Sequence, residues 1–365
     1  MRDPISLKLT KLHGVVPNSD NFSHPCDRRR YIPFFHIKDI DYEHAVFEKY
    51  YSVLYVSLNA DLTLWRKYKD YHKPKKTKII FDLADNYLSE NIVKSILKSL
   101  IFFVTRKNKN FSISFKEAVI RFLEVCDVVT VGSLEQKNDL AYYHPNVYVV
   151  RDYFYDDLAD LFLKKQVEKI PIQNEINILW EGFLHGQTKI EKQFKEILFS
   201  ITDSLKLNIN FHVVTDEHKC FLFGKYFCSP TLKVLQKKLS HRNINIYFYP
   251  WSPNNLISAS KKCDFAIIPT LNESFFQSKP ENKLILLWML GLPVLTGYTP
   301  SYSRVLKDSD NYSCLCQSCD QWADMAKLML EKEFRDKCNS NANIYIDTYA
   351  SKQLIIDTWS KIFEN

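Results

Sequence analysis

Short apolar runs recur along the chain at a spacing that suits alternating strands and helices. In the first half, runs rich in β-branched and aromatic residues predict strands at residues 51–58, 78–83, 127–131 and 147–150. Residues 91–125 have apolar positions at helical spacing, with a basic interruption at 106–110. Strands that alternate with helices indicate a parallel sheet of the α/β class.

The second half shows the same alternation. Five further runs predict strands at residues 176–180, 209–215, 244–249, 264–269 and 292–296. Helices are predicted at 190–205, 281–290 and 350–363, and residues 219–239 are expected to form a connector and a helix. Residues 264–296 therefore form a strand–helix–strand unit with a right-handed crossover.

Length and composition indicate a globular protein of two domains. A chain of 365 residues exceeds what one hydrophobic core usually serves, and the polar segment at residues 156–174 marks a boundary. No apolar run approaches the ~18 residues of a membrane span, and the first residues lack the apolar core of a signal peptide. With nine cysteines in no regular framework, we expect a cytoplasmic protein with reduced thiols.

Basic residues are concentrated in one part of the chain. Between Arg66 and Lys109, twelve Lys and Arg residues stand against four Asp and Glu residues. Anionic lipid headgroups, a lipid-diphosphate acceptor or a plain solvated surface each account for this charge, whereas nucleic acid lacks a supporting motif. Apolar positions such as Ile96, Leu97 and Leu100 lie among these charges, which fits a helix at a membrane surface or one packed on a core.

The loop and helix start at residues 270–283 carry the most informative polar groups. Lys279, Asn282 and Lys283 follow the carboxyl end of a predicted strand. Ligands of open α/β sheets bind at that edge, and a helix N-terminus adds unpaired N–H groups. These residues suit a diphosphate, and ordinary solvated lysines are the alternative.

The run SKPENKLILLWMLGLPVLTGYTPSY, preceded by CDFAIIP, resembles the donor-nucleotide segment of GT-B glycosyltransferases, more narrowly of bacterial enzymes that build surface polysaccharides. In that family the Lys/Asn/Lys region and the helix start hold the diphosphate of a nucleotide sugar. Many relatives place a ribose-binding Glu five residues before the glycine, where this chain has Leu286. Glu273 and Glu281 make an E-x7-E spacing, but it is offset from the family register relative to Gly291.

This resemblance implies two Rossmann-like domains facing each other across a cleft. We expect an N-terminal acceptor-binding domain at residues 1–165, a nucleotide-sugar-binding domain at 174–348, and a C-terminal helix at 349–365 that crosses back to the N-domain. It also implies that the loop at Gly182 approaches the donor phosphates, with His185 or Lys189 as its basic group, and that Trp251 packs near the nucleobase. A structural turn and a core tryptophan are the alternatives.

The first half supplies candidates for the acceptor side. Asp82 and Asp85 follow a predicted strand, and Asp85 is the first candidate for a general base, with helix capping as the alternative. His13, expected near the carboxyl end of a strand at residues 7–16, and Asp20 are further candidates. The neighbouring residues Arg28, Arg29 and Arg30 suit an anionic acceptor or a basic surface.

We predict a glycosyltransferase that moves a sugar from a UDP- or GDP-type donor to a hydroxyl of a glycan or lipid-linked glycan. No cofactor and no metal are expected, and Cys314, Cys316 and Cys319 lack the fourth ligand of a closed zinc site. The expected place of action is the cytoplasm, at the inner face of the membrane. A nucleotide-sugar 2-epimerase of the same fold and a non-catalytic two-domain binding module remain alternatives.

Overall fold

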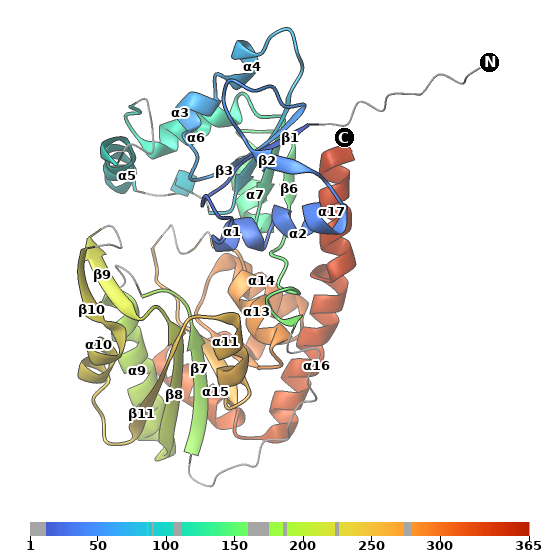
Figure 1. Ribbon diagram of the computed structural model, residues 1–365. Coiled ribbons are helices and arrows are strands. Elements are labelled where there is room, and N and C mark those ends of the chain that lie inside the picture. Colours follow the sequence, from blue (N-terminus) through green and yellow to red (C-terminus); the bar gives the residue numbers. More distant parts are fainter. Residues whose placement is uncertain are drawn as a thin grey trace. The chain divides into compact units, whose positions relative to one another are not determined.

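The computed structural model describes residues 12–85, 87–89, 91–105, 111–159, 175–184, 188–222, 226–273, 277 and 279–364. The chain divides into two compact units, Met1–Tyr153 with Gln353–Asn365 and Phe154–Lys352 (Figure 1). Each unit has its own sheet and its own hydrophobic core. The chain therefore leaves the first unit once and returns to it with its last helix.

The first unit is built on a six-stranded sheet in which all neighbouring strands are parallel, in the order β2-β1-β3-β4-β5-β6. The strands are β1 His13–Val16, β2 Tyr42–His44, β3 Val53–Ser57, β4 Lys78–Leu83, β5 Val128–Val131 and β6 Val147–Val149. The helices are α1 Pro25–Arg28, α2 Tyr31–Ile37, α3 Leu62–Trp65, α4 Tyr68–Tyr71, α5 Ile92–Val104, α6 Phe115–Leu123, α7 Leu134–Leu140 and α17 Lys352–Glu364, with a 3₁₀ turn η1 at Tyr87–Ser89. The four strands predicted after residue 50 are confirmed, whereas β2 was not predicted.

The C-terminal helix α17 packs within the first unit. Trp359 is completely buried, with its ring 6.2 Å from that of Phe34 and 6.0 Å from that of Tyr55. The Phe363 ring lies 5.2 Å from the Phe34 ring, and Lys78 donates a hydrogen bond to the Ile362 carbonyl. One apolar stripe of α17 thus covers α2 and strand β3.

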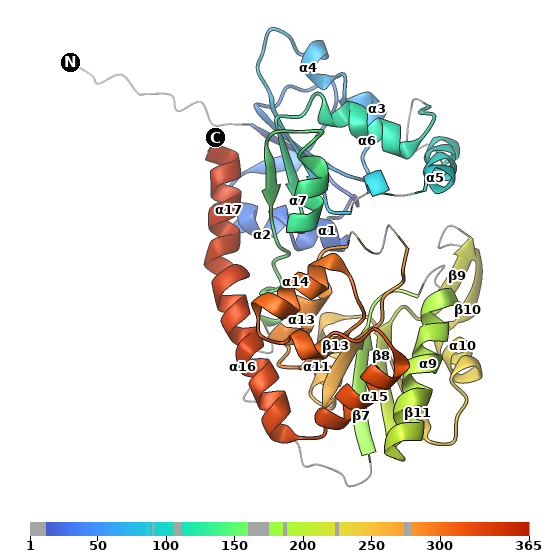
Figure 2. The same cartoon turned by 180° about the vertical axis from the view of Figure 1, so that it is seen from behind.

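The second unit has a five-stranded parallel sheet in the order β11-β8-β7-β12-β13. Its strands are β7 Glu175–Glu181, β8 Asn208–Thr215, β11 Ile244–Pro250, β12 Phe265–Ile268 and β13 Val294–Thr296, which confirms the five predicted strands. The helices are α9 Thr188–Leu205, α10 Thr231–Lys238, α11 Pro253–Ser260, α13 Asn282–Met289, α14 Pro300–Asp308, α15 Cys319–Leu328 and α16 Lys332–Tyr349, with a 3₁₀ turn η2 at Tyr312–Cys314. Helices α9 and α15 cover one face of this sheet and α11 the other (Figures 1 and 2).

An antiparallel hairpin replaces part of a predicted connector. Strands β9 His218–Leu222 and β10 Tyr226–Pro230 pair with Cys220 opposite Cys228, and a disulfide joins these two residues. The expectation that all thiols are reduced is therefore wrong for this pair. The hairpin was missed because the helical spacing of α10 begins only after residue 230.

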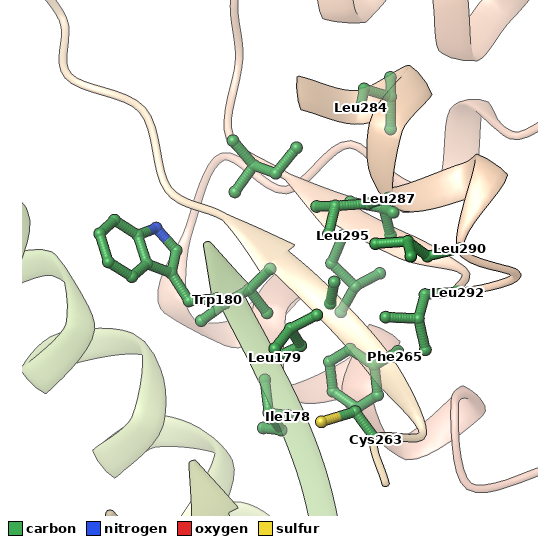
Figure 3. Close-up of a cluster of buried hydrophobic side chains, with 14 of the residues drawn as sticks. Ile178, Leu179, Trp180, Cys263, Phe265, Leu284, Leu287, Leu290, Leu292 and Leu295 are labelled. Atoms are coloured by element: carbon green, nitrogen blue, oxygen red, sulfur yellow. The ribbon is translucent and has the colours of Figure 1, made fainter. Parts of the chain in front are cut away.

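Helix α13 is held by the core of the second unit. Figure 3 shows Leu284 and Leu287 of this helix, and Leu290 directly after it, among apolar side chains of β7, β12 and β13. Leu286, at the position where many GT-B relatives have a Glu, is also buried, with 2% of its surface exposed. The apolar core therefore fixes the axis of α13 and the position of its first turn.

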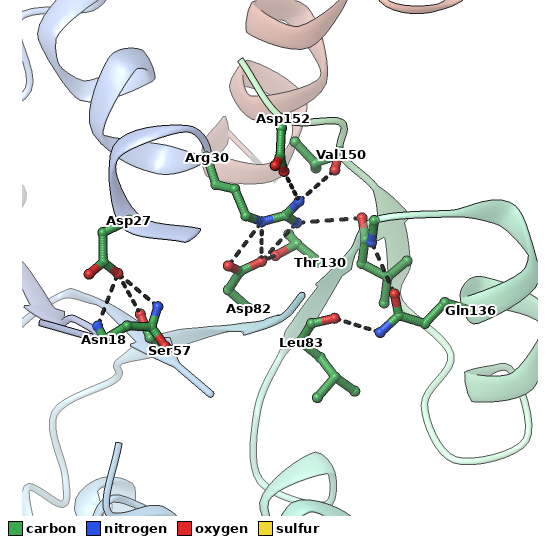
Figure 4. A network of polar contacts seen from close by, with 12 residues as sticks. Asn18, Asp27, Arg30, Ser57, Asp82, Leu83, Thr130, Gln136, Val150 and Asp152 are labelled. Atoms are coloured by element: carbon green, nitrogen blue, oxygen red, sulfur yellow. Dashed lines mark hydrogen bonds and ion pairs between the residues drawn. The ribbon is translucent and has the colours of Figure 1, made fainter. Parts of the chain in front are cut away.

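A buried ion pair joins helix, strands and loops of the first unit. Arg30 is 1% exposed, and its Nε lies 2.8 and 2.9 Å from the two carboxylate oxygens of Asp82 (Figure 4). Its other nitrogens donate to the carbonyls of Val150 and Val131, and Thr130 donates to Asp82 at 2.7 Å. The guanidinium thus ties the start of α2 to the carboxyl ends of β4, β5 and β6.

Replacing Arg30 by Met should lower the free energy of unfolding by about 3–5 kcal/mol, because it leaves the Asp82 carboxylate buried without its cation. Chemical denaturation at neutral pH measures this. Lys49→Met is the control: Lys49 pairs with Glu43 at the surface, both more than 40% exposed, and its loss should cost less than about 1 kcal/mol. Equal effects of the two changes would contradict the assignment.

Within the described ranges, no helix has both the length and the apolar character needed to cross a membrane.

Candidate active site

The carboxyl ends of β7, β8 and β11 bring polar groups together in the second unit. Glu181 is the last residue of β7, Thr215 is the last of β8, and Trp251 follows β11 directly. The first turn of α13 adds Lys283 to the same edge, since this residue bonds to Glu181. This is the edge at which open α/β sheets bind ligands.

Glu181 organises this edge although it was not singled out in the sequence. Only 6% of its surface is exposed. Its Oε1 accepts a hydrogen bond from the Trp251 indole at 2.9 Å, and Lys283 donates to its carbonyl oxygen at 2.8 Å. The Lys283 Nζ also lies 3.9 Å from the Glu181 Oε2. One residue therefore positions both the lysine and the tryptophan.

Gly182 leaves the space that the Lys283 ammonium occupies. Its φ is +147°, a conformation that L side chains rarely adopt. A Cβ at this position would lie 2.4 Å from the Lys283 Nζ and 3.1 Å from the Trp180 ring. Glycine is therefore required where this loop borders the Lys283 ammonium, while its predicted approach to donor phosphates stays a prediction.

The environment of Lys283 depresses the pKa of its ammonium. Burial is the main cause, the neighbouring Lys279 adds to it, and the Glu181 carboxylate opposes it. The Nζ also lies 5.4 Å from the centre of the Trp180 ring, within the range of a cation–π contact. Lys283 is thus a partly desolvated cation. A bound anion would stabilise its charge in place of the water that burial removed.

Two oxygens near this edge are buried without a bond. The Asn282 Oδ1 and the Thr215 Oγ1 have no hydrogen-bond partner among the described residues. Asn282 is the first residue of α13, and Thr215 ends β8. Buried polar atoms normally have partners, so donors on a ligand are expected here.

The segment before α13 is fixed by its own contacts. Arg304 of α14 donates to the buried Glu281 at 3.1 Å, and Ser301 donates to the Lys279 carbonyl at 2.7 Å. Thr299 caps α14 by accepting from the Tyr302 N–H. Glu281 is therefore committed to Arg304, while Glu273, the other half of the E-x7-E spacing, pairs with Lys189 at 2.6 Å.

The remaining residues that were predicted to bind the sugar donor differ in their exposure and contacts. The Lys189 side chain, on α9, is 69% exposed and paired with Glu273, so Lys283 is better enclosed than Lys189. Lys279 lies close enough to lower the Lys283 pKa. His185 lies outside the described residues.

The carboxyl edge of the first sheet gathers acidic residues. Asp85 is half-buried two residues after β4, and Asp152 lies three residues after β6 with 14% of its side chain exposed. Both carboxylates act on Cys26, whose pKa is raised by burial first and then by Asp85 and Asp152. Asp152 was missed by the sequence analysis; only its position after a strand could have indicated it.

Asp152 has the electrostatics of a proton acceptor. Burial raises its carboxyl pKa, with Arg30 and Arg29 opposing the shift, and its Oδ1 lies 3.4 Å from an Arg30 nitrogen. A carboxyl with a raised pKa at a strand end is a candidate acid–base group.

The other two predicted bases lie in different surroundings. His13 is the first residue of β1, at the amino end and not near the carboxyl end as expected, and its ring packs 6.2 Å from Phe35 and 5.9 Å from Phe363. Asp20 is exposed in the turn that follows β1. That turn is anchored by the buried Asp27, which accepts hydrogen bonds from Asn18, Ser19, Tyr31 and Ser57. Figure 4 shows the bonds from Asn18 and Ser57.

The three predicted acceptor-binding arginines also differ. Arg30 is enclosed and bound to Asp82, so its guanidinium serves the fold. Arg28 and Arg29 are half-buried at the end of α1, and Arg29 acts electrostatically on Asp152. Among the described residues, no three His, Cys, Asp or Glu side chains are grouped as metal ligands.

No protein-family model and no curated protein sequence matches the chain. Solved structures match its fold. WaaG, a glycosyltransferase involved in lipopolysaccharide biosynthesis, is 14% identical over 92% of this chain and 95% of its own, with a TM-score of 0.53. TarM is 13% identical with a TM-score of 0.54, over 86% of this chain and 55% of TarM, so the chain spans about half the length of TarM.

Two further matches bear on ligands and activity. A TarM mutant of S. aureus, 12% identical with a TM-score of 0.53, was crystallised with fondaparinux, alpha-GlcNAc-glycerol and UDP. A Listeria monocytogenes protein assigned as a UDP-N-acetylglucosamine 2-epimerase is 11% identical over 98% of this chain and 97% of its own, with a TM-score of 0.51. The chain thus has the GT-B fold, with two Rossmann-like domains.

Replacing Glu181 by Gln should lower the Lys283 pKa further. The change keeps an oxygen acceptor for Trp251 but removes the charge that opposes the burial effect, so the ammonium loses its proton at a lower pH. NMR titration of the Lys283 side chain measures this. Glu273→Gln, beside the exposed Lys189, should leave the Lys283 pKa unchanged. An equal Lys283 pKa in all three proteins would contradict the electrostatic role of Glu181.

Proposed function

We propose that this protein is a glycosyltransferase that moves a sugar from a nucleotide-diphosphate donor, of the UDP or GDP type, to a hydroxyl of a glycan or lipid-linked glycan. The observation that carries the proposal is the half-buried Lys283 ammonium at the start of α13, beside the bare backbone of Gly182. The GT-B fold supports it, because WaaG and TarM have this fold. By analogy with WaaG, we assign the reaction to bacterial surface-polysaccharide synthesis.

The donor diphosphate would lie against the first turn of α13. Lys283 and Lys279 supply positive charge, and the helix start supplies N–H groups and a positive dipole end. The free Oδ1 of Asn282 and the Oγ1 of Thr215 are acceptors for hydroxyl or N–H groups of the donor. Trp251, held by Glu181, offers a ring face for the nucleobase.

On the donor side, catalysis would come from stabilising the negative charge of the leaving diphosphate. When the bond from the sugar to the diphosphate breaks, negative charge develops on the leaving phosphate oxygen. Lys283 and the α13 N–H groups are preorganised for this charge, which is where such groups accelerate a reaction. We therefore propose a reaction without a metal ion, to be checked by activity in the presence of a chelator.

The acceptor side is assigned to the first unit. Asp85 is the proposed base that takes the proton of the acceptor hydroxyl if the anomeric configuration inverts, and Asp152 is the second candidate because its pKa is raised. Arg28 and Arg29 at the end of α1 are proposed contacts for an anionic acceptor. We place the reaction at the inner face of the cytoplasmic membrane, where a lipid-linked acceptor would lie.

The epimerase is the second candidate function, because a protein assigned to that activity matches over 97% of its length. Incubation with a nucleotide sugar separates the candidates. An epimerase converts the sugar without an acceptor, a transferase needs one, and a pure binding module does neither.

Lys283→Ala should weaken binding of the matching nucleoside diphosphate by about 10- to 100-fold, since it removes a charge-assisted contact worth about 1.5–3 kcal/mol. A thermal-shift screen of UDP, GDP and their sugars identifies the ligand, and calorimetry measures the Kd. Lys237→Ala on α10, an exposed lysine of the same unit, should bind like the natural protein. Unchanged affinity in Lys283→Ala would remove this residue from the site.

Asp85→Asn should leave nucleotide affinity intact and reduce transfer by at least about 100-fold, as loss of a general base does. Transfer is measured with the identified donor and a hydroxyl acceptor. Asp39→Asn, a change at an exposed position after α2, should retain transfer. If Asp152→Asn abolishes transfer while Asp85→Asn does not, the base is Asp152.

A further inference from the structure

Helix α5 turns its two serines inward. Ser95 is completely buried and Ser99 is 2% exposed, although both lie on a helix rich in apolar residues. The Ser95 Oγ accepts from the Lys116 N–H at 2.8 Å, and Ser99 donates to the Ser112 carbonyl. The serines therefore dock the helix by hydrogen bonds on the first turn of α6 and on the segment before it. A helix that served only the core would have the opposite arrangement.

The outward side of α5 is mainly apolar, and Lys94 is exposed among its apolar residues. We define the α5 face as the exposed large hydrophobic residues of this helix and of the segment after it: Ile92, Val93, Ile96, Leu97, Leu100, Phe103, Val104, Phe111 and Ile113. Their exposed fractions run from 42% to 69%. The Phe103 and Phe111 rings lie 5.6 Å apart, so the helix and the following segment form one surface. Contiguous exposed apolar surface of this kind marks an interaction site.

A basic pocket borders the α5 face. This cavity of about 220 Å³ is lined by Arg66, Lys67 and Arg121 and, at its apolar side, by Phe111 and Ile113 of the face itself. Arg121 is paired with Glu117 at 2.5 Å. Neither Arg66 nor Lys67 has a carboxylate partner within the described part of the chain. The pocket therefore carries net positive charge next to exposed aromatic and aliphatic side chains.

We propose that the α5 face docks on an anionic phospholipid bilayer and that the Arg66 pocket binds the phosphate of a lipid headgroup. Apolar side chains enter the interface between headgroups and acyl chains, while basic residues at its border contact phosphates. Charge favours a bilayer over an apolar protein surface: beside the pocket residues, the sequence between α5 and the segment at 111–113 contains Arg106, Lys107 and Lys109. This proposal rests on the proposed function only in assuming that the acceptor lies at the membrane. Binding to vesicles is measured without a nucleotide, so it is tested separately from the donor site.

Co-sedimentation of the full chain with vesicles tests this, using phosphatidylglycerol mixed with phosphatidylcholine against pure phosphatidylcholine. The natural protein should bind the anionic vesicles, with an affinity that falls as salt is added. Ile96→Ser with Leu100→Ser, both at exposed positions, should weaken binding at least tenfold. Arg66→Ala should weaken it about fivefold, the equivalent of about 1 kcal/mol per basic residue at an anionic surface.

Matched controls come from the second unit. Ile344→Ser, at a position 64% exposed on α16, and Arg242→Ala, at an exposed position, should bind vesicles like the natural protein. Thermal unfolding establishes that each variant is folded, and retained nucleotide binding separates loss of docking from loss of the proposed donor site.

Several outcomes would overturn the proposal. If the natural protein binds neither vesicle, the bilayer is the wrong occupant; concentration-dependent dimerisation that Ile96→Ser with Leu100→Ser abolishes would then assign the α5 face to a second copy. Equal vesicle binding by this double variant and the natural protein would remove α5 from the interface. Equal binding by Arg66→Ala and Arg242→Ala would remove the pocket.

Discussion

Parallel hydrogen bonding between neighbouring strands is the constraint on which the candidate residues of each unit depend. Because every strand in each five- or six-stranded sheet points the same way, all carboxyl ends of a sheet share one edge. Residues far apart in the sequence meet there as a result: Glu181, Thr215 and Trp251 in the second unit, and Asp85 and Asp152 in the first. The segments that leave the strand ends then set the chemistry of each edge. They include a lysine-bearing helix in the second unit, and acidic loops with arginines in the first.

The strands could be predicted because buried parallel strands are short apolar runs, and nine of them were found from that signal alone. The β9–β10 hairpin and its disulfide could not, because Cys220 and Cys228 become partners only through pairing in space. In the site, Lys283 and Gly182 could be predicted from their motif and their turn. Glu181 could not, since a Glu at the end of a strand has no pattern of its own, and its role comes from the lysine and tryptophan that converge on it.

For the three neighbouring arginines and for helix α5, burial decides between interpretations that the sequence leaves open. In the run of three arginines, the sequence gives no sign that Arg30 differs from Arg28 and Arg29, yet Arg30 is enclosed and bound to Asp82 while the other two remain partly accessible. In α5 the same helical spacing of apolar residues fits a core helix or a surface helix, and the inward hydrogen bonds of Ser95 and Ser99 identify which side faces the protein. Periodicity shows that a helix has an apolar stripe. Whether this stripe faces the protein or the solvent depends on tertiary contacts.

The return of α17 to the first unit has a consequence for biosynthesis. Trp359 fills space between Phe34 and Tyr55, but residues 154–352 of the second unit are translated before it. At about 5–20 residues per second, that interval is on the order of 10–40 s. During this time Trp359 is not yet available to cover Phe34 and Tyr55, whereas the second unit already has all of its own residues. The core of the first unit is therefore closed only by a helix that is translated after the whole of the second unit.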